Sequence, residues 1–144
     1  MKTWIRTLVA LATIVLAAAP LRAQDAYKVV VNPATSVASL SKAEVARLFL
    51  KQDTRWKDGK PAAIIDQPPA SPVRHDFSKT VLGKEVASVT SYWQQQVFSG
   101  RASPPVVKPS DADVVAFVSS TPGAIGYVSA SAAVAGVKTL TVTP

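Results

Sequence analysis

The sequence predicts an α/β domain in which a mixed β-sheet is flanked by helices. Short runs rich in β-branched residues alternate with stretches that carry apolar residues at helical spacing. Helix-capping residues and turn residues mark most of the boundaries between them. The chain has 144 residues, enough for one domain with one core, and no repeat or low-complexity linker divides it.

The first predicted strand covers residues 27–32, a β-branched run that an Asn-Pro turn closes. Residues 33–40 are polar and are expected to form a loop. Ser41 and Glu44 have the spacing of a capping box, in which each side chain satisfies the backbone N–H of the other residue. This pattern predicts a helix that starts after Ser41 and ends near Leu50.

A polar loop is expected at residues 52–59, and a second short strand follows at 62–66. Ser71 followed by Pro72 is typical of an N-cap and the first helical position. The spacing of apolar residues then predicts a helix over 72–82 that ends before a glycine. Its buried face is expected to consist of Val73, Phe77 and Val81.

A third helix is predicted over residues 85–98, and residues 106–107 are expected to be extended. Ser110 and Asp113 predict the capped start of a fourth helix. The buried face of the third helix is expected to consist of Val86, Val89, Trp93 and Val97.

The C-terminal part begins with a predicted buried strand over residues 124–128, in which Gly126 indicates a close approach to the backbone. Residues 129–135 are expected to form a short helix. The last predicted strand covers 137–142. Together these elements complete the alternation from which the fold class is predicted.

The N-terminal segment, residues 1–23, has the order of parts of a cleavable secretory signal peptide. Lys2 and Arg6 precede an uncharged run over 8–19, and a small residue stands at the expected cut. The alternative is a membrane anchor, but this run is shorter than the roughly 20 residues that a membrane-spanning helix needs. We therefore expect a periplasmic protein whose mature domain covers residues 24–144.

Cleavage lowers the positive charge of the chain. It removes three of the 16 basic residues, which leaves 13 against 9 acidic ones, so the net charge falls from +7 to +4. No Lys/Arg run or basic stripe interleaved with aromatic residues is present, so nucleic acid is not an expected partner. The chain has no cysteine, which excludes disulfides, thiolate zinc sites and a lipid anchor on Cys. The mature domain is not expected to be embedded in a membrane.

The stretch from Asp66 to Phe77 is the candidate binding site, because a strand ends there and a helix begins at Ser71. Free amides at a helix start and a serine hydroxyl favour an anion. Arg74 adds a guanidinium group that suits an oxyanion. The alternative, which the residues alone favour, is that Ser71 only caps its helix and that Arg74 pairs with Asp76 or faces solvent.

The sequence does not predict an enzyme, a cofactor or a metal site. The one histidine, His75, lies next to its neighbours on one predicted helix, whereas a catalytic triad is assembled from distant segments. Asp111 and Asp113 are interpreted as charges at a helix start. Trp93 is expected in the core, whereas for Trp56, in a polar loop, a core or loop contact and a ligand contact stay open.

Five short segments, in order, resemble the phosphate-binding proteins of ABC importers, and together they represent nearly all of the mature chain. They are LSKAEVARLF (40–49), WKDG (56–59), SPVRHDF (71–77), YW with FSG (92–100) and TPGAIGYV (121–128). The resemblance implies a compact, single-lobe member with a fold like that of type II periplasmic binding proteins. Members of the family have two lobes and are much longer, so half of the ligand cleft is missing here.

The phosphate loop departs from the family pattern, because the Gly-Ser-Gly-Thr motif is replaced by residues 69–72 and only Ser71 matches. The resemblance implies a module for phosphate or a related oxyanion, associated with ABC-type transport through a permease or another envelope protein. Ser71 and Arg74, with Ser36 and Ser39 from the first loop, are the expected ligand-binding residues. The alternative is a non-catalytic structural or interaction module that kept the fold and lost the ligand, which an uncovered apolar patch would support.

Overall fold

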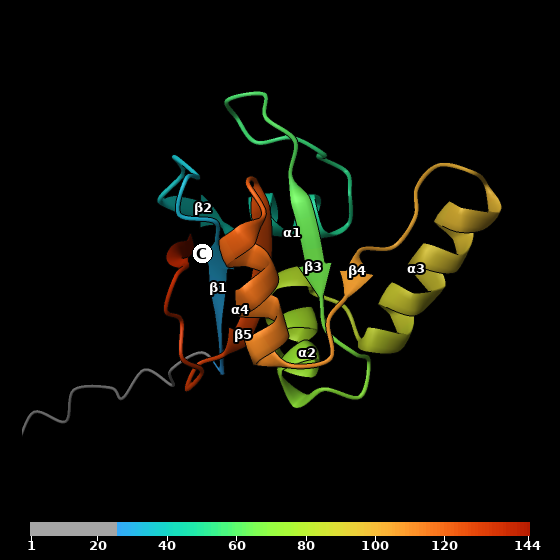
Figure 1. Ribbon diagram of the computed structural model, residues 1–144. Helices are drawn as coiled ribbons and strands as arrows, with labels where there is room; N and C mark the ends of the chain where they lie inside the picture. The colour runs from blue at the N-terminus through green and yellow to red at the C-terminus, as the bar shows by residue number, and fades with distance from the viewer. Residues whose placement is uncertain (1–25) are drawn as a thin grey trace, which may run out of the picture.

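The computed structural model of the protein describes residues 26–144 (Figure 1). The predicted signal peptide, 1–23, lies outside the described residues. Within 26–144, no helix has both the length and the apolar character needed to cross a membrane. The elements in chain order are β1 (Tyr27–Val31), β2 (Ser39–Ser41), α1 (Lys42–Phe49), β3 (Ala63–Asp66), α2 (Pro72–Phe77), the π-helical turn η1 (Ser78–Leu82), α3 (Val86–Phe98), β4 (Val106–Val107), α4 (Asp111–Ser120), β5 (Ala124–Ser129) and β6 (Lys138–Thr143).

The strands form one mixed sheet in the order β2-β6-β1-β5-β3-β4. The first strand, β1, lies inside the sheet and runs antiparallel to both of its neighbours, so that Val29 is paired with Tyr127 on one side and Leu140 on the other. The pairs β5–β3, β3–β4 and β2–β6 are parallel. The predicted mixed sheet is confirmed.

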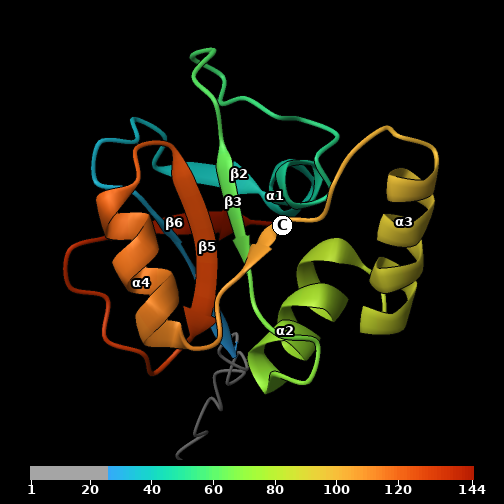
Figure 2. The ribbon, with the colours of Figure 1, turned by 45° about the vertical axis from the view of Figure 1, so that its right-hand side comes forward.

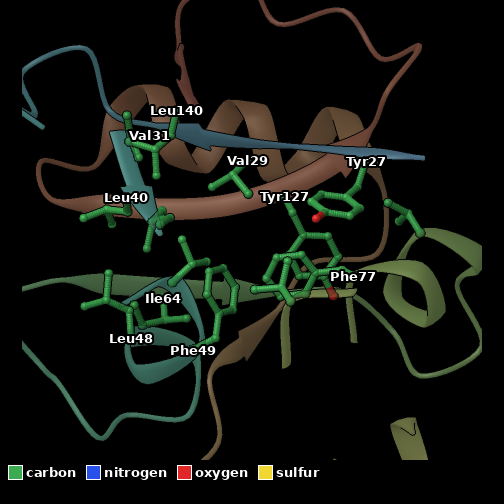
Figure 3. Close-up of a cluster of buried hydrophobic side chains, with 14 of the residues drawn as sticks. Tyr27, Val29, Val31, Leu40, Leu48, Phe49, Ile64, Phe77, Tyr127 and Leu140 are labelled. Carbon is green, nitrogen blue, oxygen red and sulfur yellow. The ribbon is translucent and has the colours of Figure 1, made fainter. Parts of the chain in front are cut away.

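Helices cover both faces of the sheet. The larger core cluster contains Phe49, Phe77 and Tyr127 between the sheet and the helices α1 and α2, as Figure 3 shows. On the opposite face, Val114 and Val118 of α4 pack against the sheet. The strands therefore bury apolar side chains on both of their faces, which explains the continuous β-branched runs in the sequence. Figure 2 shows α3 standing apart from the sheet at one side of the molecule.

The predicted helix boundaries are confirmed where a cap defines them. The hydroxyl of Ser41 accepts from the amide of Glu44 at 3.2 Å, and the Glu44 carboxylate accepts from the amide of Ser41 at 2.8 Å. Ser110 caps α4 in the same way by accepting from the amide of Asp113. The predicted helix over 72–82 consists of α2 and η1, and it ends at Gly83, which has a φ of 64°.

Three expectations about local structure are wrong. Residues 39–41 form the edge strand β2, because they pair with β6 from the far end of the chain. Residues 129–135 do not form a helix: Ser129 ends β5, and turns and irregular backbone follow, in which Ala132 and Val134 pack against the smaller core cluster. Val97 is 55% exposed, because the last turn of α3 extends beyond the body of the domain.

Gly126 lies where α4 approaches β5. A Cβ at this position would be 2.8 Å from Cγ1 of Val114 and 3.5 Å from Cγ2 of Val118. The first of these distances is too short for a carbon–carbon contact, so the absence of a side chain is what allows α4 to pack at this depth. The close approach predicted at Gly126 is confirmed.

Candidate functional site

A groove of about 490 Å³ lies between α3 and the edge of the sheet formed by β3 and β4. Asp66 ends β3 and Arg74 follows in α2, and these two residues are the charged part of its lining. Phe98, at the end of α3, is 95% exposed. A volume of this size, mostly apolar walls and few polar groups are typical of a ligand site. The walls are formed by Pro69, Thr90, Trp93, Gln94, Val97, Phe98, Pro104, Pro105 and Val107.

Arg74 is buried and forms an ion pair at the base of the groove. Its Nη1 donates to Oδ2 of Asp66 at 2.6 Å and to the carbonyl oxygen of Gln67 at 2.8 Å. Its Nε is buried and has no hydrogen-bond partner within residues 26–144. The alternative in which Arg74 pairs with Asp76 or solvent is wrong, because Asp76 is exposed and the guanidinium group points to the end of β3 instead.

The carboxylate of Asp66 is buried and accepts hydrogen bonds from three donors. Its Oδ1 accepts from the amide of Gln67 at 2.8 Å and from the hydroxyl of Tyr127, while Oδ2 accepts from Arg74. Burial raises the pKa of Asp66, and the charge of Arg74 and these hydrogen bonds oppose that rise. The carboxyl group therefore takes up a proton more readily than an aspartate in water.

Tyr127 connects this polar network to the core. Burial and then the Asp66 charge raise the pKa of the Tyr127 hydroxyl, so that it stays a proton donor. The ring of Tyr127 is stacked on Phe77, with 3.9 Å between the centroids and 7° between the planes. The position of the Asp66 carboxylate is thus fixed by a side chain that is itself locked between β5 and α2.

Gln67 is a residue of this network that sequence analysis missed. Its Nε2 donates to Oδ1 of Asp111 at 2.8 Å and to the carbonyl oxygen of Tyr127 at 3.0 Å, and its Oε1 accepts from Ser71 at 3.3 Å. Asp111 is therefore a partner of Gln67 as well as a charge at a helix start. The available signal was a polar Asp-Gln pair directly after an apolar strand.

Ser71 lies at the N-cap position of α2, but its side chain makes no capping hydrogen bond. Its hydroxyl donates to Gln67 instead, and the residue is half-buried. The interpretation in which the Ser71 hydroxyl only caps its helix is wrong, because the neighbouring glutamine amide engages that hydroxyl. Ser71 and Arg74 are thus brought together around Gln67.

Ser36 and Ser39 lie far from Ser71 for two different reasons. Ser36 follows the carboxyl end of β1, where Val31 pairs with Ile125 near the start of β5, whereas Asp66 lies at the other end of the parallel β3–β5 pair. Ser39 lies on the edge strand β2, which β6, β1 and β5 separate from β3. Both serines are exposed. The structure therefore does not bring them into one site with Ser71 and Arg74.

The remaining residues that the sequence singled out are a buried tryptophan that fixes a loop, a second buried tryptophan and an exposed histidine. Trp56 is buried, and its Nε1 donates to the carbonyl oxygen of Gly123 at 3.0 Å, so it fixes the polar loop to the start of β5. Trp93 is buried, as expected. His75 is exposed on α2. Over the described range 26–144, no group of three His, Cys, Asp or Glu residues is placed to hold a metal ion.

The fold is similar to about half of the solved structures of phosphate ABC transporter substrate-binding proteins. One similar structure is described as a phosphate ABC transporter substrate-binding protein with bound phosphate, from Clostridium perfringens; it is 17% identical, with a TM-score of 0.65. A phosphate transport receptor from Vibrio cholerae is 20% identical, with a TM-score of 0.64. PstS from Borrelia burgdorferi is 17% identical, with a TM-score of 0.57.

The matches cover 82%, 82% and 83% of this chain but only 45%, 46% and 47% of those structures, in the same order. The chain therefore spans less than half the length of these neighbours. No protein-family model matches the sequence, and no curated protein matches it. The resemblance drawn from the five sequence segments is confirmed for the fold alone, because a structural likeness at identities this low carries no statement about function.

Proposed function

We propose that the protein is an exported, non-catalytic solute-binding module for a small oxyanion, phosphate or a related anion, that serves ABC-type transport. Its binding residues are Arg74, which lines the groove, and the nearby Ser71, which like Arg74 is hydrogen-bonded to Gln67. Ser36 and Ser39, which were expected to join them, lie at the other end of β1 and on the opposite edge strand, so they have no part in this site. The shared fold supports the binding of a solute, and the neighbour with bound phosphate supports the class of ligand.

The observation that carries the proposal is the unpartnered Nε of Arg74. A buried guanidinium group normally uses its donors, and leaving one without an acceptor costs free energy. An oxyanion that reaches the groove base from the side of Ser71 would supply that acceptor. Arg74 also lines the groove, so binding through Nε requires its side chain to turn towards the ligand.

Asp66 limits the affinity of this site. Its carboxylate already neutralises Arg74 at 2.6 Å and would repel an incoming anion. Protonation of Asp66 removes that repulsion, and burial raises the pKa of this group. We therefore infer weak binding at neutral pH that strengthens as the pH falls, with uptake of a proton by Asp66 on binding.

Calorimetric titration of the purified protein with sulfate tests this proposal, because sulfate keeps its charge over the weakly acidic and neutral range while phosphate does not. The expected result is binding that tightens as the pH falls, with a heat that depends on the ionisation enthalpy of the buffer. Asp66→Asn should bind sulfate more tightly and without the pH dependence. Arg74→Lys should bind more weakly, and the exposed Arg101→Lys serves as the matched control.

Absence of heat with millimolar sulfate and phosphate at every pH, with Arg74→Lys and Asp66→Asn both folded, would contradict oxyanion binding. If the unmodified protein and Arg74→Lys bind sulfate with the same affinity, the anion binds at a site that does not include Arg74. Association with an importer is tested separately, by co-purification with the permease encoded nearest to this gene.

A second candidate function, an interaction module that no longer needs a solute, is favoured by a different observation. Phe98 is 95% exposed, and Val97, Val106 and Val107 are 55%, 57% and 48% exposed. These four residues, named here the apolar rim, lie at the end of α3 and on β4. Phe98, Val97 and Val107 line the groove together, and exposed large apolar side chains gathered in this way mark an interaction site.

A further inference from the structure

We propose that the groove between α3 and β4 binds an extended, uncharged, apolar peptide segment, which adds to the sheet as a strand beside β4. The inference rests on the second candidate function above and names its partner. Its first basis is that β4 is an edge strand, because β3 is its one neighbour in the sheet.

The backbone of Val107 faces the groove side of this edge. In the parallel pairing of β3 with β4, Asp66 lies opposite Val107, and the amide of Lys108 donates to the carbonyl oxygen of Asp66 at 2.9 Å. In a parallel ladder this register uses the N–H and C=O of Asp66, so those of Val107 point away from β3. A peptide strand laid along this edge finds one donor and one acceptor already oriented.

The opposite wall of the groove is the helix α3. Its residues Trp93 and Val97 offer apolar surface, and Thr90 and Gln94 offer side-chain hydrogen bonds. An edge strand on one side and a helix on the other is an arrangement in which an extended peptide gains backbone pairing from the strand and pockets for alternate side chains from the helix.

The size of the apolar rim favours a peptide over a second copy of the chain. Phe98 can bury about 200 Å². Three valines that are each about half exposed add less, whereas a stable protein interface buries roughly 800 Å² on each partner. An extended segment inside the groove is contacted on two sides and needs no further surface.

The charges of the groove indicate that the peptide is uncharged. Asp66 and Arg74 are the charged residues of its lining, and they neutralise each other at 2.6 Å. A peptide side chain with a net charge would enter a mostly apolar groove without a partner, which is unfavourable. Apolar side chains instead meet Phe98, Val97 and Val107.

The test begins with selection from a phage-displayed library of unstructured heptapeptides on the purified protein, followed by synthesis of the selected peptide. Two matched variants separate the groove from the rest of the strand, because Val107 lines the groove and the neighbouring Val106 does not. Val107→Glu should weaken binding of the synthetic peptide by about tenfold or more, and Val106→Glu by less than about twofold. Phe98→Ser gives a second variant with a substitution outside the sheet.

Backbone pairing has a readout of its own. Methylation of the peptide's backbone nitrogens, one at a time, should abolish binding at every second position and leave it unchanged at the others. Bound peptide should also slow hydrogen exchange at the Val107 amide. Selection without enriched sequences, equal losses in Val107→Glu and Val106→Glu, or binding that tolerates methylation at every position would each overturn the proposal. A dimer in sedimentation that Val107→Glu or Phe98→Ser dissociates would place a second copy in the groove instead.

Separate titrations of the unmodified protein with the synthetic peptide and with sulfate distinguish this inference from the oxyanion proposal. The two ligands are measured one at a time on the same protein, so either kind of binding can fail without the other. Peptide binding without sulfate binding would leave the groove proposal standing and overturn the oxyanion site.

Discussion

The carboxylate of Asp66 and the guanidinium group of Arg74 are joined at 2.6 Å, beneath a groove whose walls are mostly apolar. The first residue ends a strand and the second lies in the helix that follows, so the pair closes the loop between them. Both side chains are buried, and each is the charge partner of the other. The consequences of this pairing can be measured as stability and as pH dependence.

Removal of one member of the pair should destabilise the domain strongly. Arg74→Met leaves the Asp66 carboxylate buried without a counter-charge, and the loss of such a partner costs about 3–5 kcal/mol. Urea denaturation followed by circular dichroism measures the change. The double variant Asp66→Asn with Arg74→Met should lose much less stability than the two single variants lose together. A loss equal to the sum of the two single losses would contradict the pairing.

The pH dependence of stability should carry a contribution from Asp66 with an unusual sign. Its pKa is higher in the folded protein than in the unfolded chain, so the folded state binds the proton more tightly. This contribution is present at acidic pH and is lost as the pH rises through the folded pKa. Urea denaturation over this range should show the contribution in the unmodified protein and its absence in Asp66→Asn; parallel curves would contradict the shift.

Glu44 should act in the opposite direction at low pH. The hydrogen bond from Lys57 and then those from Ser41 lower the pKa of Glu44 from 4.5 to about 2. A lowered pKa contributes stability above the unfolded value, and that stability is lost as the pH falls from about 4.5 towards 2. Glu44→Gln should flatten the acid denaturation curve in this window, and Lys57→Met should reproduce part of the effect because it removes the largest cause.

A methyl group at Gly126 should push α4 away from the sheet. The new Cβ would lie 2.8 Å from Cγ1 of Val114, and overpacking of a buried site typically costs about 1–3 kcal/mol. Thermal denaturation of Gly126→Ala measures the loss. Val114→Ala in the same chain removes the clashing atom, so the double variant should lose less than the sum of the two single changes; simple additivity would argue against the clash.

Local signals predicted much of the fold, because caps and turns depend on residues close in sequence. Ser41 with Glu44 and Ser110 with Asp113 marked helix starts that the structure confirms. The strand β2 was missed because its three residues become a strand only by pairing with β6 at the far end of the chain.

The candidate site was predicted in part. Ser71 and Arg74 lie close together, since they share one helix start, but their role as ligand-binding residues stays a prediction. The choice of Asp66 over Asp76 as the partner of Arg74 depends on the direction in which a helical side chain points, which spacing alone did not resolve. The separation of Ser36 from this site depends on the order of strands in the sheet, which also lies beyond local pattern.

The central position of β1 has a consequence for the order in which the chain acquires structure. Its neighbours β5 and β6 are the last two strands of the sequence, so β1 can pair within the sheet only after the C-terminal part of the chain is available. A polypeptide that crosses a membrane with its N-terminus leading therefore cannot close this sheet until almost its full length is on the far side. If this chain is exported in that direction, as proposed, Val29, Val30 and Val31 have no strand partners during transit, and the topology then separates translocation and folding in time.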